Sequence, residues 1–366
     1  MKQLVMSTLS AAACLAVAGC STTGTTVSNF STIREYTLRN KTGMEVRLSN
    51  YGATITSIVV PDRAGNPTDV VLGYDRAENY INAVDRPYFG SVIGRYSGSI
   101  AAGKFSMDGK EFQLPVNASG NHENGGRMGF DKVVWDSQAN GNSIIFEYVS
   151  KDREEGYPGN LTVTVVYKLH MDNVLQIEYY AETDKTTPVN LSNRTFFNLA
   201  GEGNGTILGH ELTINAETYL PVNDQLIPTG EMAPVAGTPF DFLVSKPIGQ
   251  DIGSENEQLV LVGGYDQNWV LNKGEGGITY AATVYEPGSG RFVEVSTMEP
   301  GLRFFSGNGL DGRLQGKAGK SYKMNGGFCL ETQHFPNSPN QPDFPTTILH
   351  PGEEYKSVTV YRFGVK

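Results

Sequence analysis

Cysteine and histidine are scarce in this chain of 366 residues, which has three of the former and five of the latter. Two of the cysteines, Cys14 and Cys20, lie near the N-terminus. Only Cys329 is left for the rest of the chain, so an internal disulfide is excluded there. No two histidines have the spacing of metal ligands, and we therefore predict no metal site. The stability of the fold must come from its hydrophobic core.

Positive charge is also under-represented. Lys and Arg total 29 against 39 Asp and Glu, a formal net charge of −10, and they form no basic run. This composition argues against nucleic acid as a partner. Amphipathic helices are missing as well, because the 3.6-residue apolar period is absent almost everywhere. Beyond the N-terminal segment, no hydrophobic run is long enough to span a bilayer.

The N-terminus carries the longest apolar stretch. Lys2 precedes a mostly apolar segment from Leu4 to Val17, and small residues then lead to Cys20. An apolar segment this short, followed by small residues, is typical of a secretory signal rather than a membrane span. The cysteine after Ala-Gly resembles a bacterial lipobox, which implies cleavage before Cys20 and a lipid on its thiol. A plain signal peptide cut nearby is the alternative.

We therefore expect an exported lipoprotein, anchored in a bacterial membrane and facing the periplasm or the cell exterior. Residues 1–19 are predicted as the signal peptide, and the Ser/Thr/Gly-rich residues 20–31 as a flexible tether. Residues 32–366 contain no strict repeat and no Pro-rich linker. Since all-β domains can reach this size, we predict a single domain there.

Aromatic residues at 10% and 43 glycines suit many strands joined by tight turns. Strand, turn, strand patterns recur, as where Asp108-Gly109 separates two short apolar-alternating runs. Clear strand patterns occur at residues 45–50, 105–107, 112–114, 144–149, 161–169, 175–179, 278–285, 292–297 and 357–363. The sequence therefore predicts an all-β fold, one large antiparallel β-sandwich with short helical turns at most.

One alternating run near the C-terminus carries a conspicuous carboxylate. The run FCLETQ ends in a Pro/Asn-rich segment. Because successive side chains of a strand point to opposite faces, Phe328 and Leu330 should face a core. Cys329, Glu331 and Gln333 should face the other way. If that face is a cleft, Glu331 is placed as a general base; if it is open water, Glu331 is an ordinary solvated side chain.

Five irregular polar motifs interrupt the strand pattern. They are GRYSGSI at 94–100, NHENGG at 121–126 with GFDK at 129–132, TPVNLSNRTFFNL at 187–199, GYDQNW at 264–269, and the run around Glu331. In this order and at these spacings they resemble the aldose 1-epimerase (galactose mutarotase) family, from about Thr32 to Lys366. The segments EGYPG at 155–159, EPGL at 299–302 and GN at 307–308 add to the resemblance.

The resemblance implies a galactose mutarotase-like β-sandwich, of the supersandwich type, with an open sugar cleft. It also implies interconversion of the α and β anomers of a free hexose such as galactose or glucose. A carboxylate takes the proton of the anomeric hydroxyl while an acid protonates the ring oxygen, and the ring opens, rotates and recloses. The family requires neither metal nor cofactor. Each proton-transfer partner is typically worth about 10²–10⁴ in rate.

Taken residue by residue, the resemblance places Glu331 at the general base. Arg95 stands at a sugar-binding arginine, whose forked guanidinium can hold adjacent hydroxyls. Asp266 stands at a sugar-binding aspartate, and Gln267 beside it at a position where His is common. From the residues alone, Arg95 can equally be an exposed salt-bridge residue and Asp266 a turn cap.

Two pocket positions depart from the family pattern. Arg194 replaces the acid His of the motif Asn-His-Ser/Thr-Tyr/Phe-Phe-Asn-Leu, and Asn124 replaces the His of Leu-His-Gly-Gly. A guanidinium has a pKa above about 12, so Arg194 can stabilise negative charge on the ring oxygen but is a poor proton donor at neutral pH. Asn124 can hydrogen-bond a hydroxyl but cannot titrate. Lesser departures are Gly98-Ser99 in place of Asn-Arg, and Gly309 in place of a larger apolar residue.

Three functions fit this pattern. The first is a retuned or impaired aldose 1-epimerase acting on free hexoses. The second is a sugar-binding lipoprotein of the same fold with little or no catalysis, which the missing acid His favours. The third is an enzyme for an altered sugar, in which Arg194 pairs with a phosphate or carboxylate; Glu123 opposes this if it faces the cleft. His122 is a candidate substitute for the missing acid if its side chain reaches the cleft.

Overall fold

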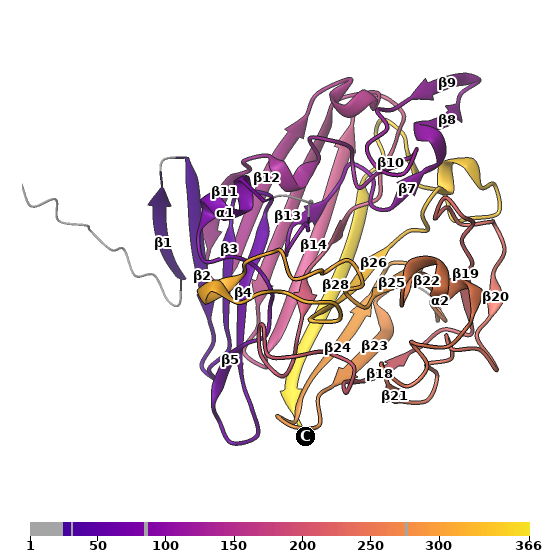
Figure 1. Cartoon of the computed structure of the whole chain (residues 1–366). Coiled ribbons are helices and arrows are strands. Elements are labelled where there is room, and N and C mark those ends of the chain that lie inside the picture. Colours follow the sequence, from indigo (N-terminus) through magenta and orange to yellow (C-terminus); the bar gives the residue numbers. More distant parts are fainter. Residues whose placement is uncertain (1–24, 31, 84–86, 275–276) are drawn as a thin grey trace, which may run out of the picture.

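The computed structural model describes residues 25–30, 32–83, 87–274 and 277–366. Strands dominate it, as Figure 1 shows, and the predicted all-β class is confirmed. Among the described residues the α-helices are two short ones, α1 (Ala77–Ile81) and α2 (Glu257–Val262). Neither helix, nor any other described segment, has the length and apolarity of a membrane-spanning helix.

The largest sheet has nine strands, all paired antiparallel, and forms the back of the molecule in Figure 1. In spatial order they are β11 (Asp136–Asn140), β12 (Ser143–Ser150), β13 (Leu161–Leu169), β14 (Val174–Thr183), β28 (Tyr355–Val365), β24 (Arg291–Thr297), β23 (Thr279–Tyr285), β18 (Glu211–Ile214) and β21 (Lys246–Pro247). Side chains alternate between buried and less buried along β13 and β14, which is the pattern of a strand with one face on a core. Most strands predicted from residue 144 onward lie in this sheet.

A six-stranded antiparallel sheet carries the strand that the sequence singled out. Its order is β17 (Phe196–Phe197), β26 (Phe328–Gln333), β25 (Gly301–Phe305), β22 (Asp266–Val270), β19 (Thr218–Leu220) and β20 (Ala233–Pro234). The hydroxyls of Thr332 and Thr359 lie 2.6 Å apart, and the Tyr361 hydroxyl donates to the Leu330 carbonyl at 3.2 Å. These bonds join β26 to β28, so the six-stranded sheet packs face to face on the nine-stranded one.

A third sheet of five strands completes one side, on the left in Figure 1. Its order is β1 (Thr25–Phe30), β2 (Ile33–Arg39), β3 (Glu45–Ser49), β4 (Thr54–Pro61) and β5 (Pro67–Asp69). Four small antiparallel pairs shape the loops: β8 (Lys104–Met107) with β9 (Lys110–Gln113), β10 (His122–Glu123) with β7 (Ser99–Ile100), β16 (Ser192–Asn193) with β6 (Val92–Ile93), and β15 (Thr187–Pro188) with β27 (Ile348–Leu349). The β8–β9 pair is the hairpin predicted at Asp108-Gly109.

One hydrophobic cluster runs through all three sheets, with side chains from Tyr36 to Phe363. It contains Leu48 of the five-stranded sheet, Ile177 of the nine-stranded sheet and Leu330 of the six-stranded sheet. A second, smaller cluster around Phe196, Phe305 and Cys329 lies on the opposite face of the six-stranded sheet. That sheet is therefore sandwiched, and its second face supports the site described below.

The N-terminal predictions meet the structure only in part. Residues 1–24, which include Cys14 and Cys20, lie outside the described residues, so the signal peptide and lipid anchor remain predictions. The tether predicted for residues 20–31 is corrected, because Thr25–Phe30 is strand β1 and pairs along its length with β2. Thr and Val are strong strand formers, and here they extend an open sheet edge.

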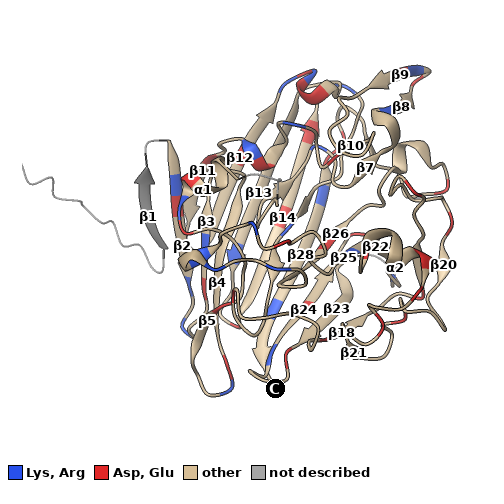
Figure 2. Cartoon of the chain, viewed as in Figure 1, with Lys and Arg blue, Asp and Glu red and all other residues tan. Residues whose placement is uncertain are grey.

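Lys and Arg are interspersed with Asp and Glu along the strands in Figure 2.

Candidate active site

The outer face of the six-stranded sheet gathers charged and amide side chains. Arg303 of β25 pairs with Glu331 of β26 on one side and with Asn268 of β22 on the other. Directly paired residues of neighbouring strands point to the same face, so these three side chains lie together. Asp266, Phe305 and Cys329 form the next row on that face. The opposite row contains core residues such as Leu330, which is the alternation that the sequence indicates.

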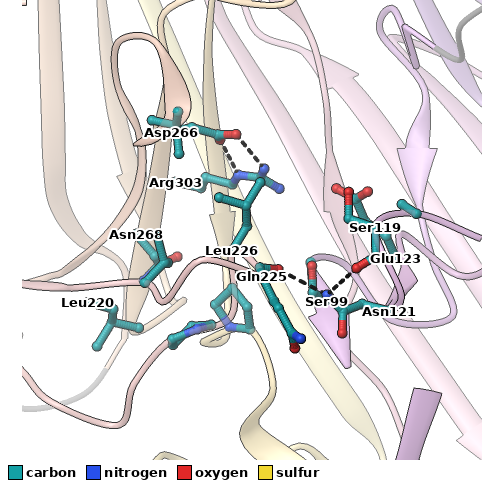
Figure 3. A pocket seen from close by; sticks show the side chains of 16 residues that line it. Ser99, Ser119, Asn121, Glu123, Leu220, Gln225, Leu226, Asp266, Asn268 and Arg303 are labelled. Carbon is teal, nitrogen blue, oxygen red and sulfur yellow. Dashed lines mark hydrogen bonds and ion pairs between the residues drawn. The ribbon is translucent and has the colours of Figure 1, made fainter. Parts of the chain in front are cut away.

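Two adjoining cavities open above this face. The smaller, of about 90 Å³, is lined by residues that include Ser99, Asp266, Asn268 and Arg303. Figure 3 shows the Asp266–Arg303 pair on one side of this cavity and Ser99, Asn121 and Glu123 on the other. The larger, of about 540 Å³, is lined by Tyr88, Asn124, Arg194, Phe196, Phe305, Gly309 and others. Ala118 and Glu123 line both, so the two cavities form one cleft.

Glu331 lies beneath this cleft, in contact with Arg194. The Glu331 side chain is fully buried, and its Oε1 accepts a hydrogen bond from Arg194 Nη1 at 2.6 Å. The guanidinium carbon of Arg194 lies 4.9 Å from the ring centre of Phe305 and 5.6 Å from that of Phe196. Burial is the largest single influence and lowers the pKa of Arg194, but the combined attraction of the acidic groups around it, led by Glu331, raises this pKa above its usual value. The Arg194 guanidinium is therefore held in its charged form, bonded to Glu331 and in contact with two aromatic rings.

Asp266 forms the second ion pair of the cleft, with Arg303. Arg303 Nε donates to Asp266 Oδ1 at 2.7 Å and Nη2 donates to Oδ2 at 3.0 Å. This bidentate geometry uses both carboxylate oxygens and is the strong form of an arginine–carboxylate contact. Burial lowers the pKa of Arg303, but the Asp266 and Glu331 carboxylates outweigh it and the pKa is raised. Sequence reasoning missed Arg303, although its place opposite Glu331 follows once the strand pairing is known.

Several buried polar atoms on this face have no hydrogen-bond partner among the described residues. They are Glu331 Oε2, Arg194 Nε, Asn268 Oδ1 and Gln333 Nε2. Buried polar groups in folded proteins are normally hydrogen-bonded, so orphans clustered in one place indicate groups meant for a ligand or for water. Donors and acceptors are both present, which matches a ligand rich in hydroxyl groups, since each hydroxyl both donates and accepts.

The motif at residues 94–100 does not present the predicted Arg95 to the cleft; other residues of the motif reach it. Gly98 and Ser99 line the smaller cavity. Asn124 lines the larger cavity, and its Oδ1 accepts a hydrogen bond from the Gly98 amide at 3.0 Å. Asn124 therefore braces the Gly98 loop while its side chain remains at the cleft. Nothing lies within 4 Å of where a side chain at Gly309 would start, so the missing side chain there enlarges the cavity.

The structure does not bring Arg95 into the cleft. Its side chain is buried, and its N–H groups donate to Ser150 Oγ and to the carbonyls of Ser150, Lys151, Pro158 and Gly159, at 2.8–3.2 Å. All three nitrogens are thus occupied, and burial lowers the pKa of Arg95. Arg95 fastens two loops together, and this geometry does not support the predicted contact with sugar.

Gln267 and His122 also point elsewhere. Gln267 is buried; its Oε1 accepts from the Asp266 amide and its Nε2 donates to the Gln258 carbonyl. It pairs with Phe304 on the core-facing row, so the strand alternation turns it away from the cleft. His122 is fully buried between the Pro115 carbonyl at 2.8 Å and the Tyr157 hydroxyl at 2.7 Å. Burial lowers the pKa of His122, and it offers no substitute for the missing acid.

Comparison with known proteins gives the same family. The aldose 1-epimerase family profile matches residues 34–362. The galactose mutarotase of Bos taurus is 47% identical over 322 residues, which cover 88% of this chain and 92% of the relative. This chain belongs to the aldose 1-epimerase family. The aldose 1-epimerase of Escherichia coli is 38% identical over 333 residues, 90% of this chain and 95% of the relative.

Solved structures agree with the aldose 1-epimerase assignment. The galactose 1-epimerase of Lactobacillus acidophilus superimposes with a TM-score of 0.80 at 30% identity, covering 91% of this chain and 95% of that one. The GalM/aldose epimerase homologue of Caenorhabditis elegans gives 0.83 at 27% identity, covering 90% and 98%. Aldose 1-epimerases are isomerases, so the predicted enzyme class is confirmed.

Proposed function

We propose that this protein interconverts the α and β anomers of free hexoses, such as galactose and glucose, with Glu331 as the general base. The observation that carries the proposal is the Glu331 carboxylate, buried under the cleft with Oε2 unpaired. A buried carboxylate with an unused oxygen can accept the proton of an anomeric hydroxyl. The hydroxyl-compatible orphans of Asn268 and Gln333 lie on the same face and support a sugar as the ligand.

Arg194 limits the rate of the reaction in this proposal. It stands where the family pattern has its acid His, and its raised pKa makes it a poor proton donor. As a fixed cation it can stabilise negative charge on the ring oxygen while a water molecule supplies the proton. Loss of a positioned general acid costs about 10²–10⁴ in rate. We therefore expect slow turnover, with the ring opened by Glu331 and reclosed after the aldehyde end rotates.

A sugar-binding protein with little catalysis is the second candidate. The Arg194–Glu331 bond favours it, because it occupies one oxygen of the base at 2.6 Å. An oxygen held in this way is not free to accept the proton of a sugar hydroxyl. The two candidates share the cleft and differ only in turnover.

Polarimetry separates them. Freshly dissolved α-galactose and α-glucose relax to the anomeric equilibrium, and the mature protein should accelerate this relaxation above the buffer rate. The Glu331→Gln variant keeps the shape of the side chain and removes the base, so it should bring the rate back to that of buffer. Glu147→Gln, a change in the exposed row of β12, is the matched control and should leave the rate unchanged.

Calorimetric titration with galactose completes the test. Binding together with Glu331-dependent relaxation supports the epimerase, whereas binding without any acceleration supports the sugar-binding protein. Absence of both binding and acceleration for galactose and glucose rejects the proposal.

We further propose that the protein is exported and held at a bacterial membrane by a lipid on Cys20. The N-terminal pattern of Lys2, the apolar segment and the small residues before Cys20 supports this. The full-length protein expressed in a bacterial host should partition into a detergent phase, and Cys20→Ala should move it to the aqueous phase. Equal partitioning of the two forms contradicts the anchor.

A further inference from the structure

The charges of the cleft do not balance. Three carboxylates, Glu123, Asp266 and Glu331, face two guanidiniums, Arg194 and Arg303. At the rim, Asp311 and Arg313 are paired with each other and largely exposed, so they cancel. Among the described residues of the cleft, one negative charge is left over. A ligand that carries a phosphate or carboxylate would add to this excess, which argues against an anionic sugar.

Glu123 carries the excess charge. Arg194 is bonded to Glu331 and Arg303 is bonded to Asp266, each at 2.6–3.0 Å. The Glu123 backbone is fixed by Asn117 and by the pairing of β10 with β7, but its carboxylate makes no hydrogen bond or ion pair within the described part of the chain. A longer-range attraction links it to Arg303. Glu123 is half-buried, so its charge is only partly screened by water.

Glu123 also occupies a central position. It lines both cavities, at the place where the smaller meets the larger. Figure 3 shows it across the smaller cavity from Asp266 and Arg303. The four buried polar orphans on the floor independently indicate that a polar ligand belongs here. A ring bound over Glu331 would therefore have one of its substituents within reach of Glu123.

We propose that the cleft prefers a free hexosamine, a reducing sugar with one protonated amino group, over the corresponding neutral hexose. This inference rests on the proposed function, because it takes the same cleft as the sugar site. An ammonium group would supply the missing positive charge and donate to the unpaired Glu123 carboxylate. An ammonium group also gains the Coulomb attraction of the Glu123 carboxylate, which the neutral hydroxyl of a hexose in the same place does not have.

Calorimetric titration of the mature protein with galactosamine, glucosamine, galactose and glucose at pH 6.5 tests this. We expect each amino sugar to bind roughly tenfold more tightly than its neutral counterpart, a difference of about 1.4 kcal/mol. Glu123→Gln should reduce the ratio of affinities to about one, while changing the affinity for the neutral hexoses much less. Glu111→Gln, an exposed charge on β9 outside the cleft, should leave the ratio at its wild-type value.

Four results would overturn the inference. If neutral hexoses bind or are turned over but the ratio in the wild type is near one, the preference is wrong and the proposed function stands. If the ratio is high but Glu123→Gln does not lower it, the assignment to Glu123 is wrong. If galacturonate binds more tightly than galactosamine, the charge argument is wrong. If no sugar of either kind binds or is turned over, the proposed function fails together with the inference.

Discussion

Two regions of the molecule differ in how far their buried polar groups are hydrogen-bonded: the loop region around Arg95, outside the cleft (the wall), and the face of the six-stranded sheet under the cleft (the floor). In the wall, every nitrogen of Arg95 donates to a carbonyl or to Ser150, and the space beside it is too small to hold water. On the floor, the Arg194–Glu331 pair leaves one nitrogen and one oxygen buried without a partner among the described residues. Buried polar groups whose hydrogen bonds are all made stabilise the fold, whereas buried groups on the floor with a hydrogen bond still to make can bind a ligand.

Two buried carboxylates repeat the contrast. Glu299 accepts a hydrogen bond from Tyr355 at 3.3 Å, and its other oxygen lies 2.6 Å from His334 Nδ1. Within the described part of the chain, Glu331 bonds to Arg194 through one oxygen and leaves the other without a partner. Both are almost completely buried, so burial alone does not distinguish a structural carboxylate from a reactive one. The unused hydrogen-bonding capacity of Glu331 is what distinguishes it from Glu299.

The largest effect should come from the wall. Arg95→Met keeps much of the side-chain volume and leaves the carbonyls of Lys151, Pro158 and Gly159 without their donor. We expect the free energy of unfolding to fall by about 3–5 kcal/mol, measured by urea denaturation, because several buried acceptors lose their bonds together. Arg47→Met, on the exposed side of β3, is the control and should cost less than about 1 kcal/mol. Normal stability with weakened galactose binding would instead make Arg95 a sugar ligand.

A smaller effect is expected on the floor at Asp266. Asp266→Asn leaves Arg303 with one acceptor in place of two and with an uncompensated charge. The free energy of unfolding should fall by about 1–3 kcal/mol, and galactose binding should weaken as Arg303 becomes free to move. In the double variant Asp266→Asn, Arg303→Gln, much of the stability should return, since no buried charge is left unpaired. Additive losses in the double variant would mean that the pair is not coupled.

The smallest effect is a pH dependence at Glu299 and His334. Burial by itself would lower the pKa of His334 and raise that of Glu299, but the attraction and the hydrogen bond between the two groups act the other way and are stronger together. The pKa of His334 is therefore raised above 6.5, and that of Glu299 is lowered below 4.5. The His334 contribution to stability is therefore complete below pH 6.5 and is lost as the pH rises through the raised value. The Glu299 contribution is present above pH 4.5 and is lost as the pH falls through the lowered value.

Urea denaturation at pH 6 and pH 9 measures this contribution. The wild type should lose stability between the two values, and Glu299→Gln should lose clearly less, because His334 then has no charged partner. Glu294→Gln, which removes an exposed pairing with Arg362, should behave as the wild type does. An unchanged pH dependence in Glu299→Gln would show that the two groups are not linked.

The sequence alone predicted the all-β class and the strand that carries Glu331. Both depend on local alternation, which a sequence displays directly. The family resemblance placed Arg194 and Asp266 at the cleft, and both residues line it in the structure. Arg95 and Gln267 lie away from the cleft: Arg95 because its side chain bonds to two neighbouring loops, which the sequence does not show, and Gln267 because it follows Asp266 in strand β22 and so faces the core. Arg303 was missed because its neighbours Asp266 and Glu331 come from strands distant in the chain.

The central claim is that Glu331 is an intact base and that Arg194 limits the reaction. The most direct measurement is polarimetry of α-galactose with the wild type and with Arg194→His combined with Asn124→His, each with and without Glu331→Gln. We expect the two histidines to raise the rate by roughly 10² or more, and Glu331→Gln to abolish the gain. A wild type that already turns over as fast as the two-histidine variant, through Glu331, would contradict this claim.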